Sequence, residues 1–197
     1  MNGKSTPYVA DRVAVHEAID ALLNPNTGAP YRSASGFLTV VFTDIVESTE
    51  FVRRVGDERG RAAVRDLEEQ VAALASKHSG RVVKNLGDGS LLSFGSNSSA
   101  IAFALDLQDA CSDGPLQMRV GMAAGEPIQE DGDIHGTVVA QASWIGDLGD
   151  AGEVIVSDTV RQLAAGKGFD FEPKGEVSLK GFDEPERVWN VTQTDRT

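Results

Sequence analysis

The order of apolar segments in this sequence predicts an α+β fold, a ferredoxin-like βαββαβ core extended by a helix, a strand and a C-terminal hairpin. A continuous run of apolar and β-branched residues at 37–43 is typical of a buried strand. Two further runs, 81–86 and 90–94, flank Gly87-Asp88-Gly89, which is a strong hairpin signal. A segment with helical spacing of apolar residues follows the first strand, and another follows the hairpin.

The first half of the chain supplies a strand and a long helix. The strand at 37–43 runs into Asp44, and Ser48 and Thr49 are placed to cap the helix that follows. The segment 57–78 is amphipathic, because its apolar residues recur on one face. We therefore expect this helix to cover one side of the sheet.

The second half of the chain alternates helices and strands. The helix after the hairpin begins at Asn97 or Ser98 and reaches Ala110, and residues 125–132 are expected to form a solvated polar loop. The remaining predicted elements are a strand at 116–124, a helix at 137–145, a strand at 153–157, a helix from a capping Asp158 to Ala165, and hairpin strands at 176–180 and 187–192.

Composition divides the chain into three parts. Residues 1–36 form an N-terminal helix and linker, because apolar residues recur at helical spacing between Val9 and Leu23 and a stretch with proline and glycine follows. This part either receives a signal or dimerises, or it merely packs on the domain. Residues 37–193 form the domain that carries the function, and residues 194–197 form a tail.

The charge balance excludes two classes of partner. The chain of 197 residues has 18 basic and 30 acidic residues and a formal net charge of -12. Such a chain repels a nucleic-acid backbone and an anionic membrane surface. We therefore expect neither nucleic acid nor a membrane as a partner, and an anionic ligand would need locally placed cations.

Cysteine usage and hydropathy indicate the cytoplasm. The single cysteine, Cys111, cannot form an internal disulfide and lies in an apolar helical pattern, which fits a reducing compartment. No apolar run has the length of a membrane span, and the residues after Met1 lack the apolar core of a signal peptide.

Two aspartates at strand ends, Asp44 and Asp88, are candidate metal ligands. If their strands pair, both carboxylates lie at one edge of the sheet. Hard oxygen ligands of this kind suit Mg²⁺ or Mn²⁺, which take further ligands from water and substrate phosphates. On spacing alone, a helix cap at Asp44 and a hairpin turn at Asp88 explain the same residues equally well.

Four segments, 42–49, 83–89, 119–125 and 179–181, resemble in order and spacing the motifs of the class III adenylate/guanylate cyclase catalytic domain. The resemblance covers residues 36–193, and its C-terminal part is most similar to actinobacterial adenylate cyclases. It implies the class III cyclase fold, ATP as substrate, and a homodimer whose two composite active sites lie at the subunit interface.

The resemblance implies a metal site and a phosphate site. Asp44 and Asp88, with the backbone carbonyl of Ile45, match the ligands of two Mg²⁺ or Mn²⁺ ions per site, and the two aspartates count as catalytic. Ser48 and Thr49 are expected to bind substrate, because a helix start beside an acidic strand end suits a metal-bound phosphate.

The resemblance also implies how the nucleotide is recognised. Lys84 matches the position that reads the adenine ring, and Asp133 matches the acceptor of the adenine amino group. A lysine donor with an aspartate acceptor fits adenine and not guanine. Lys180 matches a lysine that contacts the phosphates. His135 is expected to be exposed and receives no role.

The sequence departs from the family at two positions. The family places an asparagine seven residues after the aspartate that reads adenine and an arginine four further on, but this chain has Ala140 and Trp144 there. Loss of one such transition-state contact costs roughly 10²- to 10³-fold in rate. The expected activity is therefore weak, with Thr137 or Gln141 as partial substitutes.

Two other functions remain open from the sequence. The chain could bind ATP without turning it over, as a cyclase-like pseudoenzyme, or it could be a regulatory dimerisation domain. A further hypothesis concerns Trp144, which could anchor the dimer interface as a large apolar side chain.

Overall fold

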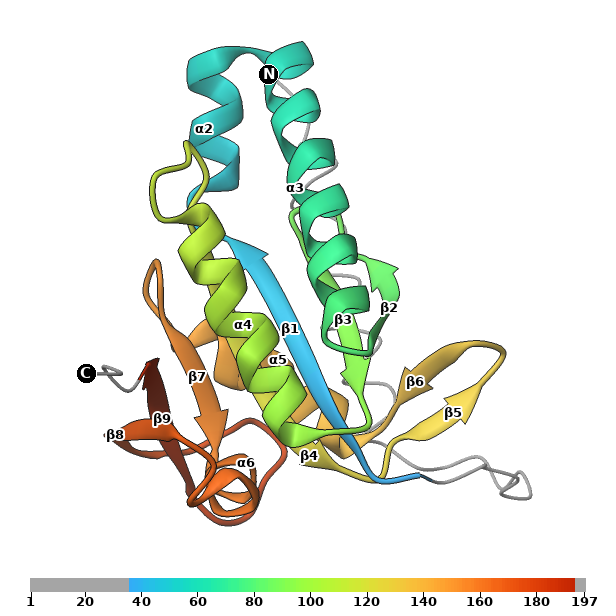
Figure 1. The fold of residues 1–197 in the computed structure, drawn as a ribbon, viewed down its shortest axis with the longest axis vertical. Coiled ribbons are helices and arrows are strands. Elements are labelled where there is room, and N and C mark those ends of the chain that lie inside the picture. The colour runs from blue at the N-terminus through green and yellow to red at the C-terminus, as the bar shows by residue number, and fades with distance from the viewer. Residues whose placement is uncertain (1–35, 194–197) are drawn as a thin grey trace, which may run out of the picture.

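A computed structural model describes residues 36–193, which form a seven-stranded sheet with helices on both faces and a small separate hairpin (Figure 1). The strands are β1 (Leu38–Ile45), β2 (Gly80–Asn85), β3 (Gly89–Phe94), β4 (Met118–Gly125), β5 (Ile128–Glu130), β6 (Asp133–His135), β7 (Val154–Ser157), β8 (Phe169–Val177) and β9 (Glu186–Gln193). The helices are α2 (Ser48–Val55), α3 (Asp57–Lys77), α4 (Asn97–Cys111), α5 (Thr137–Asp147) and α6 (Asp158–Ala164).

The predicted ferredoxin-like core is confirmed by the strand order β2-β3-β1-β4-β7-β9-β8. The central strand β1 pairs antiparallel with β3 on one side and with β4 on the other. Beyond this core, β7 pairs parallel with β4, and the β9–β8 hairpin continues the sheet. The first four strands therefore form the βαββαβ unit, and the later strands extend it.

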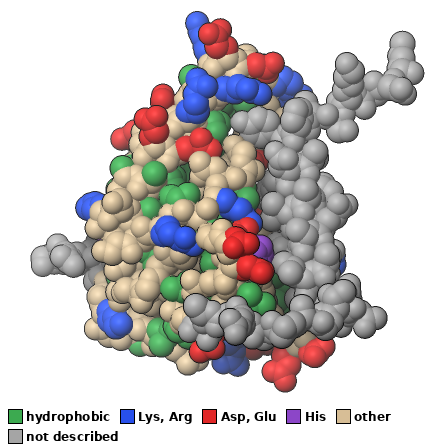
Figure 2. All heavy atoms as spheres, turned by 90° about the vertical axis from the view of Figure 1, so that its right-hand side faces the viewer, with side chains coloured by type: hydrophobic (Ala, Val, Ile, Leu, Met, Phe, Trp, Pro, Cys, Tyr) green, Lys and Arg blue, Asp and Glu red, His purple; other side chains and the backbone are tan. Residues whose placement is uncertain are grey.

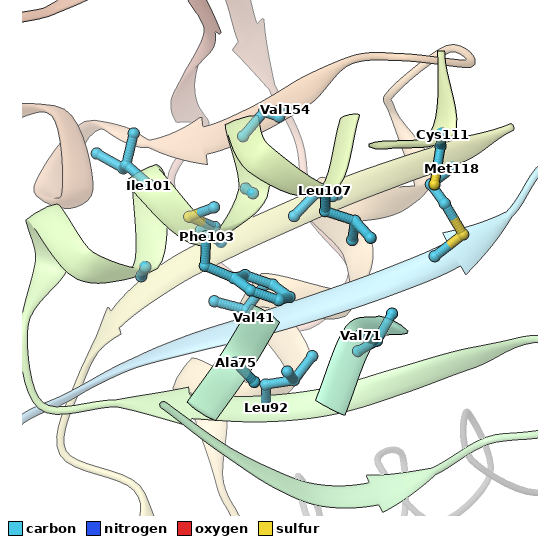
Figure 3. Packing of buried hydrophobic residues seen from close by; sticks show 14 of the residues in the cluster. Val41, Val71, Ala75, Leu92, Ile101, Phe103, Leu107, Cys111, Met118 and Val154 are labelled. Carbon is cyan, nitrogen blue, oxygen red and sulfur yellow. The ribbon is translucent and has the colours of Figure 1, made fainter. Parts of the chain in front are cut away.

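Alternate residues of β1 face two different helix layers. Val41 belongs to the cluster formed with α3 and α4, and Figure 3 shows Phe103 of α4 lying close to Val41, with Leu92 and Ala75 nearby. Val40 belongs to a second cluster formed with α5 on the opposite face. Because β1 is buried on both faces, its sequence is apolar without a polar alternation.

Helix α5 approaches the sheet closely through two glycines. A Cβ atom placed on Gly121 of β4 would lie 2.2 Å from the backbone nitrogen of Gly146 in α5. No side chain larger than hydrogen fits there, so the end of α5 is held directly against β4. This contact brings Asp147, the last residue of α5, beside the C-terminal end of β1.

Four sequence expectations need correction. Residues 125–132 are not a simple loop, because β5 lies inside them and pairs with β6. Ser48 is the first residue of α2 and caps no helix, since Glu47 holds the cap position with a φ of 56°. The residue that caps α6 is Ser157 and not Asp158. The first strand of the C-terminal hairpin, expected at 176–180, is β8, which begins at Phe169 and ends at Val177.

Two other expectations receive no test from the described residues. The N-terminal helix and linker at 1–36 and the tail at 194–197 lie essentially outside residues 36–193.

Among the helices that the structure describes, none combines the length and the apolar character needed to cross a membrane.

Candidate active site

The two predicted metal ligands lie together at the end of the central strands. Asp44, near the end of β1, pairs with Gly89, the residue after Asp88. The backbone N–H of Ile45 donates to the carbonyl of Asp88 at 2.8 Å, which ties the two turns together. The hydroxyl of Ser48 donates to Oδ2 of Asp88 at 3.1 Å, and Asp88 is 6% exposed. Ser48 thus orients Asp88 from the first turn of α2.

A cation of the chain itself, Arg119 on β4, holds the Asp44 carboxylate. Its Nε and Nη2 lie 2.8 Å and 2.7 Å from the same oxygen, Oδ2 of Asp44. The guanidinium also lies 3.1 Å from Oδ1 of Asp147 and donates to its backbone carbonyl. Arg119 therefore bridges two carboxylates, a role that the sequence did not reveal because Arg119 lies within a strand motif.

A cavity of about 40 Å³ opens between these groups. Its lining comprises Phe42, Thr43, Asp44, Leu86, Asp88, Gly89, Arg119, Ser143, Gly146 and Asp147. One bound water needs roughly 10–15 Å³ of such volume, so the cavity has room for an ion with a few oxygen ligands.

The donors at this cavity fit a hard cation that completes its shell from elsewhere. Within residues 36–193, no three His, Cys, Asp or Glu side chains gather as a complete metal site. Asp44 and Asp88 supply two carboxylates, which is the protein share typical of Mg²⁺ sites where phosphates and water provide the rest. The residues present therefore fit such an ion when a phosphate-bearing ligand accompanies it.

A second polar pair joins β2 to β6. Nζ of Lys84 lies 2.6 Å from Oδ2 of Asp133, and Arg81 donates to the carbonyl of Gly132 at 3.0 Å. Burial alone would raise the pKa of the Asp133 carboxyl, but hydrogen bonds from Lys84 and from the backbone N–H of Ile134 outweigh burial and hold that pKa below its ordinary value. Asp133 is therefore an ionised acceptor at neutral pH.

His135 lies beside this pair. Its Nε2 is 3.7 Å from Oδ2 of Asp133, and its side chain is half-buried, so the expectation of a simply exposed histidine was wrong. Figure 2 shows the side of the molecule that carries β2 and the β5–β6 hairpin, where basic, acidic and histidine side chains lie close together. The side chains of Lys84 and Asp133 are 39% and 31% exposed, so the pair is accessible from the surface.

The two positions that depart from the cyclase motif are buried. Ala140 is 1% exposed and Trp144 is 9% exposed, and both belong to one cluster with Leu179. The indole ring of Trp144 meets Phe182 edge to face, with ring centroids 5.8 Å apart. The hypothesis that Trp144 anchors the dimer interface is therefore wrong, because its own chain already covers this side chain.

The remaining predicted residues lie at the surface or have other partners. Lys180 and Thr49 are exposed, Lys180 in the turn before β9. Gln141, expected as a partial substitute for the missing polar groups, lies near Glu186 instead, where its amide opposes the rise that burial gives to the pKa of that carboxyl. Thr137, the other expected substitute, is exposed at the start of α5.

The family is decided by a direct match. The model of the adenylate and guanylate cyclase catalytic domain matches residues 31–192. The chain belongs to this family, the class III cyclases. The family match agrees with the α+β fold and with the four motifs of the sequence.

Named relatives of this cyclase domain include adenylate cyclases. A Rhizobium meliloti protein provisionally named adenylate cyclase 3 is 34% identical over 137 residues, which cover 65% of this chain and 23% of the relative. An adenylate cyclase of Streptomyces coelicolor is 32% identical over 121 residues, which cover 60% of this chain and 32% of the relative. The cyclase domain thus spans a minor part of both relatives.

A solved structure agrees in fold over nearly the whole of the described domain. The adenylate/guanylate cyclase/hydrolase of Silicibacter pomeroyi is 25% identical, with a TM-score of 0.74, and the match covers 83% of this chain and 100% of that chain.

The structure of this cyclase domain brings Asp44 to Asp88 and Lys84 to Asp133. Neither Lys84 nor Asp133 lines the cavity at Asp44 and Asp88.

Proposed function

We propose that this cyclase domain is an adenylate cyclase that converts ATP to cyclic AMP and pyrophosphate with low activity. The observation that carries the choice of adenine is the ion pair of Lys84 and Asp133, whose Nζ and Oδ2 lie 2.6 Å apart. The family supports the reaction type, and the adenylate cyclase relatives support the nucleotide.

The chemistry of the pair favours adenine over guanine. Adenine offers an amino donor beside a ring-nitrogen acceptor, which match a carboxylate acceptor and an ammonium donor. Guanine offers a carbonyl acceptor beside a ring N–H donor, so it would place like with like at both contacts. Because both side chains are held at one place by β2 and β6, a purine that meets one of them also meets the other.

The proposed reaction is a displacement at the α-phosphorus, in which one P–O bond forms and another breaks. The ribose 3′ oxygen attacks this phosphorus, its proton leaves to solvent, and the bond to the β-phosphate oxygen breaks to release pyrophosphate. Asp44, Asp88 and the carbonyl of Ile45 would hold two Mg²⁺ or Mn²⁺ ions, which supply activation of the attacking oxygen and charge neutralisation of the leaving group. Ser48 orients Asp88, and Lys180 and Thr49 would contact the phosphates.

We propose that the active site is composite and that the chain acts as a homodimer. Lys84 and Asp133 do not line the cavity of Asp44 and Asp88, so one chain does not enclose a nucleotide between the two groups. A second copy, related by a two-fold axis, would bring its Lys84 and Asp133 to the carboxylates of the first. Each dimer would then hold two equivalent sites.

The buried cluster supports the proposal of a low activity. Ala140 and Trp144 offer no cation to the charge that develops on the phosphate in the transition state. Both side chains are buried in an apolar cluster, which keeps them away from the phosphate. The same observation favours a second candidate, a domain that binds ATP without turnover. A regulatory dimerisation domain is less well supported, because such a domain has no need of the Lys84–Asp133 pair.

Cyclic AMP formation from ATP tests the proposal, with Asp44→Ala as the blank. Calorimetric titration with a non-hydrolysable ATP analogue and Mn²⁺ separates the other functions. Binding without product would assign the domain to the ATP-binding pseudoenzymes, and absence of both would leave a dimerisation domain.

A further inference from the structure

The two positions that lack the family's polar residues pack beneath the turn that carries Lys180. Leu179 is 6% exposed and shares a cluster with Ala140 and Trp144, and Phe182 packs against the same cluster. The ring of Phe182 stands at 81° to the indole of Trp144. The residue before Lys180 and the second residue after it are therefore both fixed on α5.

The turn itself is tight. The backbone N–H of Phe182 donates to the carbonyl of Leu179 at 3.1 Å, and Gly181 has a φ of 81°. A turn with a positive φ at its third residue needs glycine there, and it projects the side chain of its second residue outward. Lys180 is that second residue, and it is exposed.

A second contact fixes the far end of this segment to α5. Burial raises the pKa of Glu186, the first residue of β9, and the nearby side-chain amide of Gln141 on α5 opposes that rise. Oε1 of Glu186 also accepts from the backbone N–H of Asp158 at 3.4 Å. The segment from Leu179 to Glu186 therefore packs on α5 at its start and lies beside α5 and α6 at its end.

Helix α5 also reaches the carboxylate cavity. Ser143, Gly146 and Asp147 line the cavity at Asp44 and Asp88, whereas Ala140 and Trp144 lie on the side of α5 that packs on the turn. One rigid helix thus contacts both the cavity and the turn that holds Lys180.

We propose that Trp144 is a positioning residue for Lys180: it replaces a direct polar contact with the nucleotide by an apolar anchor that holds the lysine turn in place for the triphosphate. This inference rests on the proposed function for its ligand, a nucleoside triphosphate. It adds a role that the family motif does not contain, because an arginine in this position would not pack on Phe182 in the same way. Trp144 acts through the turn and does not touch the substrate.

The test compares four variants of the full chain: Trp144→Ala, Trp144→Phe, Lys180→Ala and the double variant Trp144→Ala/Lys180→Ala. Trp189→Ala is the matched control, because Trp189 is the second tryptophan of the chain, packs against a different apolar cluster and lies beneath Arg161 of α6. Two quantities are measured: amide hydrogen exchange of residues 178–184, and the affinities for adenosine and for a non-hydrolysable ATP analogue with Mn²⁺.

We expect Trp144→Ala to speed exchange in the turn and to weaken binding of the ATP analogue by about 10- to 100-fold, as Lys180→Ala does, since each variant loses the charged contact of Lys180 with the phosphates. Adenosine affinity stays the same in all variants. The double variant binds no more weakly than Lys180→Ala, Trp144→Phe keeps most of the affinity, and Trp189→Ala leaves exchange in the turn unchanged.

Unchanged exchange in Trp144→Ala, or a double variant that multiplies the two losses, would overturn the inference. A purely structural Trp144 would lower the affinities for adenosine and for the ATP analogue alike, which also overturns it. If the wild-type protein forms cyclic AMP and any of these results is found, the proposed function stands and only the role of Trp144 is removed.

Discussion

Arg119 and Asp44 form an ion pair in which two guanidinium nitrogens lie 2.8 Å and 2.7 Å from one carboxylate oxygen. Asp147 shares the same guanidinium at 3.1 Å. Asp44 is therefore held by a cation of its own chain at the point where we propose that a metal ion binds. A metal ion that binds Asp44 must compete with Arg119, and Asp147 can keep the arginine in place when it does.

Removal of Arg119 is predicted to strengthen the binding of Mn²⁺ in the absence of nucleotide. Arg119→Gln removes a positive charge beside the site while it keeps hydrogen-bonding capacity, so Mn²⁺ affinity should rise about tenfold. Titration of Mn²⁺ followed by electron paramagnetic resonance measures this change, with Asp44→Asn as the control that loses binding. A fall in affinity with Arg119→Gln would show that orientation of Asp44 outweighs charge repulsion.

The base preference is predicted to depend on Asp133. Asp133→Asn keeps the size of the side chain but gives it an amide that can donate, so the preference for ATP over GTP analogues should fall about tenfold or more. Competition of the two analogues for the protein measures the ratio. The matched variant Asp131→Asn changes an exposed carboxylate of the same hairpin. If both variants change the ratio equally, the net charge of the hairpin is responsible and Asp133 does not read the base.

Restoring the family's residues is predicted to fail. Ala140→Asn with Trp144→Arg places an amide and a guanidinium into a cluster that is now apolar, and loss of the Trp144 packing alone costs about 3–5 kcal/mol. We expect a lower urea midpoint and no rise in cyclic AMP formation. A large rise in activity with unchanged stability would show that these side chains can turn toward the nucleotide.

The contact between α5 and β4 gives a prediction for stability. Gly121→Ala would drive a Cβ to 2.2 Å from a backbone nitrogen of α5, and overpacking of this kind costs about 1–3 kcal/mol or more. Gly95→Ala is the control, because a Cβ there has no atom within 4 Å. Urea unfolding of both variants should show a clear loss for the first and a small effect for the second. Equal midpoints would contradict the close approach.

Acid is predicted to weaken the link between α3 and α4. Oδ2 of Asp106 lies 2.6 Å from Nζ of Lys77 and 2.8 Å from Nε2 of His78, and these contacts, Lys77 first, hold the pKa of Asp106 below its ordinary 3.8. A carboxyl with a depressed folded-state pKa stabilises the fold above its unfolded pKa, and this stabilisation is lost as pH falls through the folded value.

Asp106→Asn therefore lowers the melting temperature at pH 7 by about 1–4 °C, since a partly exposed pair contributes about 1 kcal/mol or less. The difference from the wild-type protein should shrink as pH falls below about 4. Thermal unfolding at pH 7 and pH 3.5 measures it. A constant difference at both pH values would assign the loss to packing.

The fold was largely predictable because its core elements have strong periodic signals. The apolar run of β1 and the Gly87-Asp88-Gly89 turn lie where the sequence places them. The β5–β6 hairpin was missed because each strand has three residues and a polar composition, which gives no periodic signal. The pair of Lys84 and Asp133 came from the motif, and the hairpin explains how it forms.

The contacts that define the site's surroundings were not predictable from spacing. Arg119 and Asp44 are 75 residues apart in sequence, and their contact depends on the register of β1 with β4. Trp144 was misassigned to a dimer interface because Phe182 lies in a distant turn whose position depends on the added strands. Pattern reasoning identified the residue types, but only the fold could pair them.

A composite site makes inactive variants complement each other. Asp44→Ala lacks a metal ligand and Lys84→Met lacks a base contact, so each homodimer should be inactive. An equal mixture should recover about a quarter of the wild-type rate, because half of the random dimers carry one intact site of two. A mixture as inactive as its components would place both groups in a single-chain site or rule out turnover.

Cyclic AMP formation from ATP by the purified chain tests the central claim most directly. The rate is measured with Mn²⁺ and with Mg²⁺ and compared with Asp44→Ala under the same conditions. The account predicts a metal-dependent product above the Asp44→Ala blank, at a rate at least about 10²- to 10³-fold below that of a cyclase domain that keeps the asparagine and the arginine. A product level equal to that of the blank with both metals would contradict it.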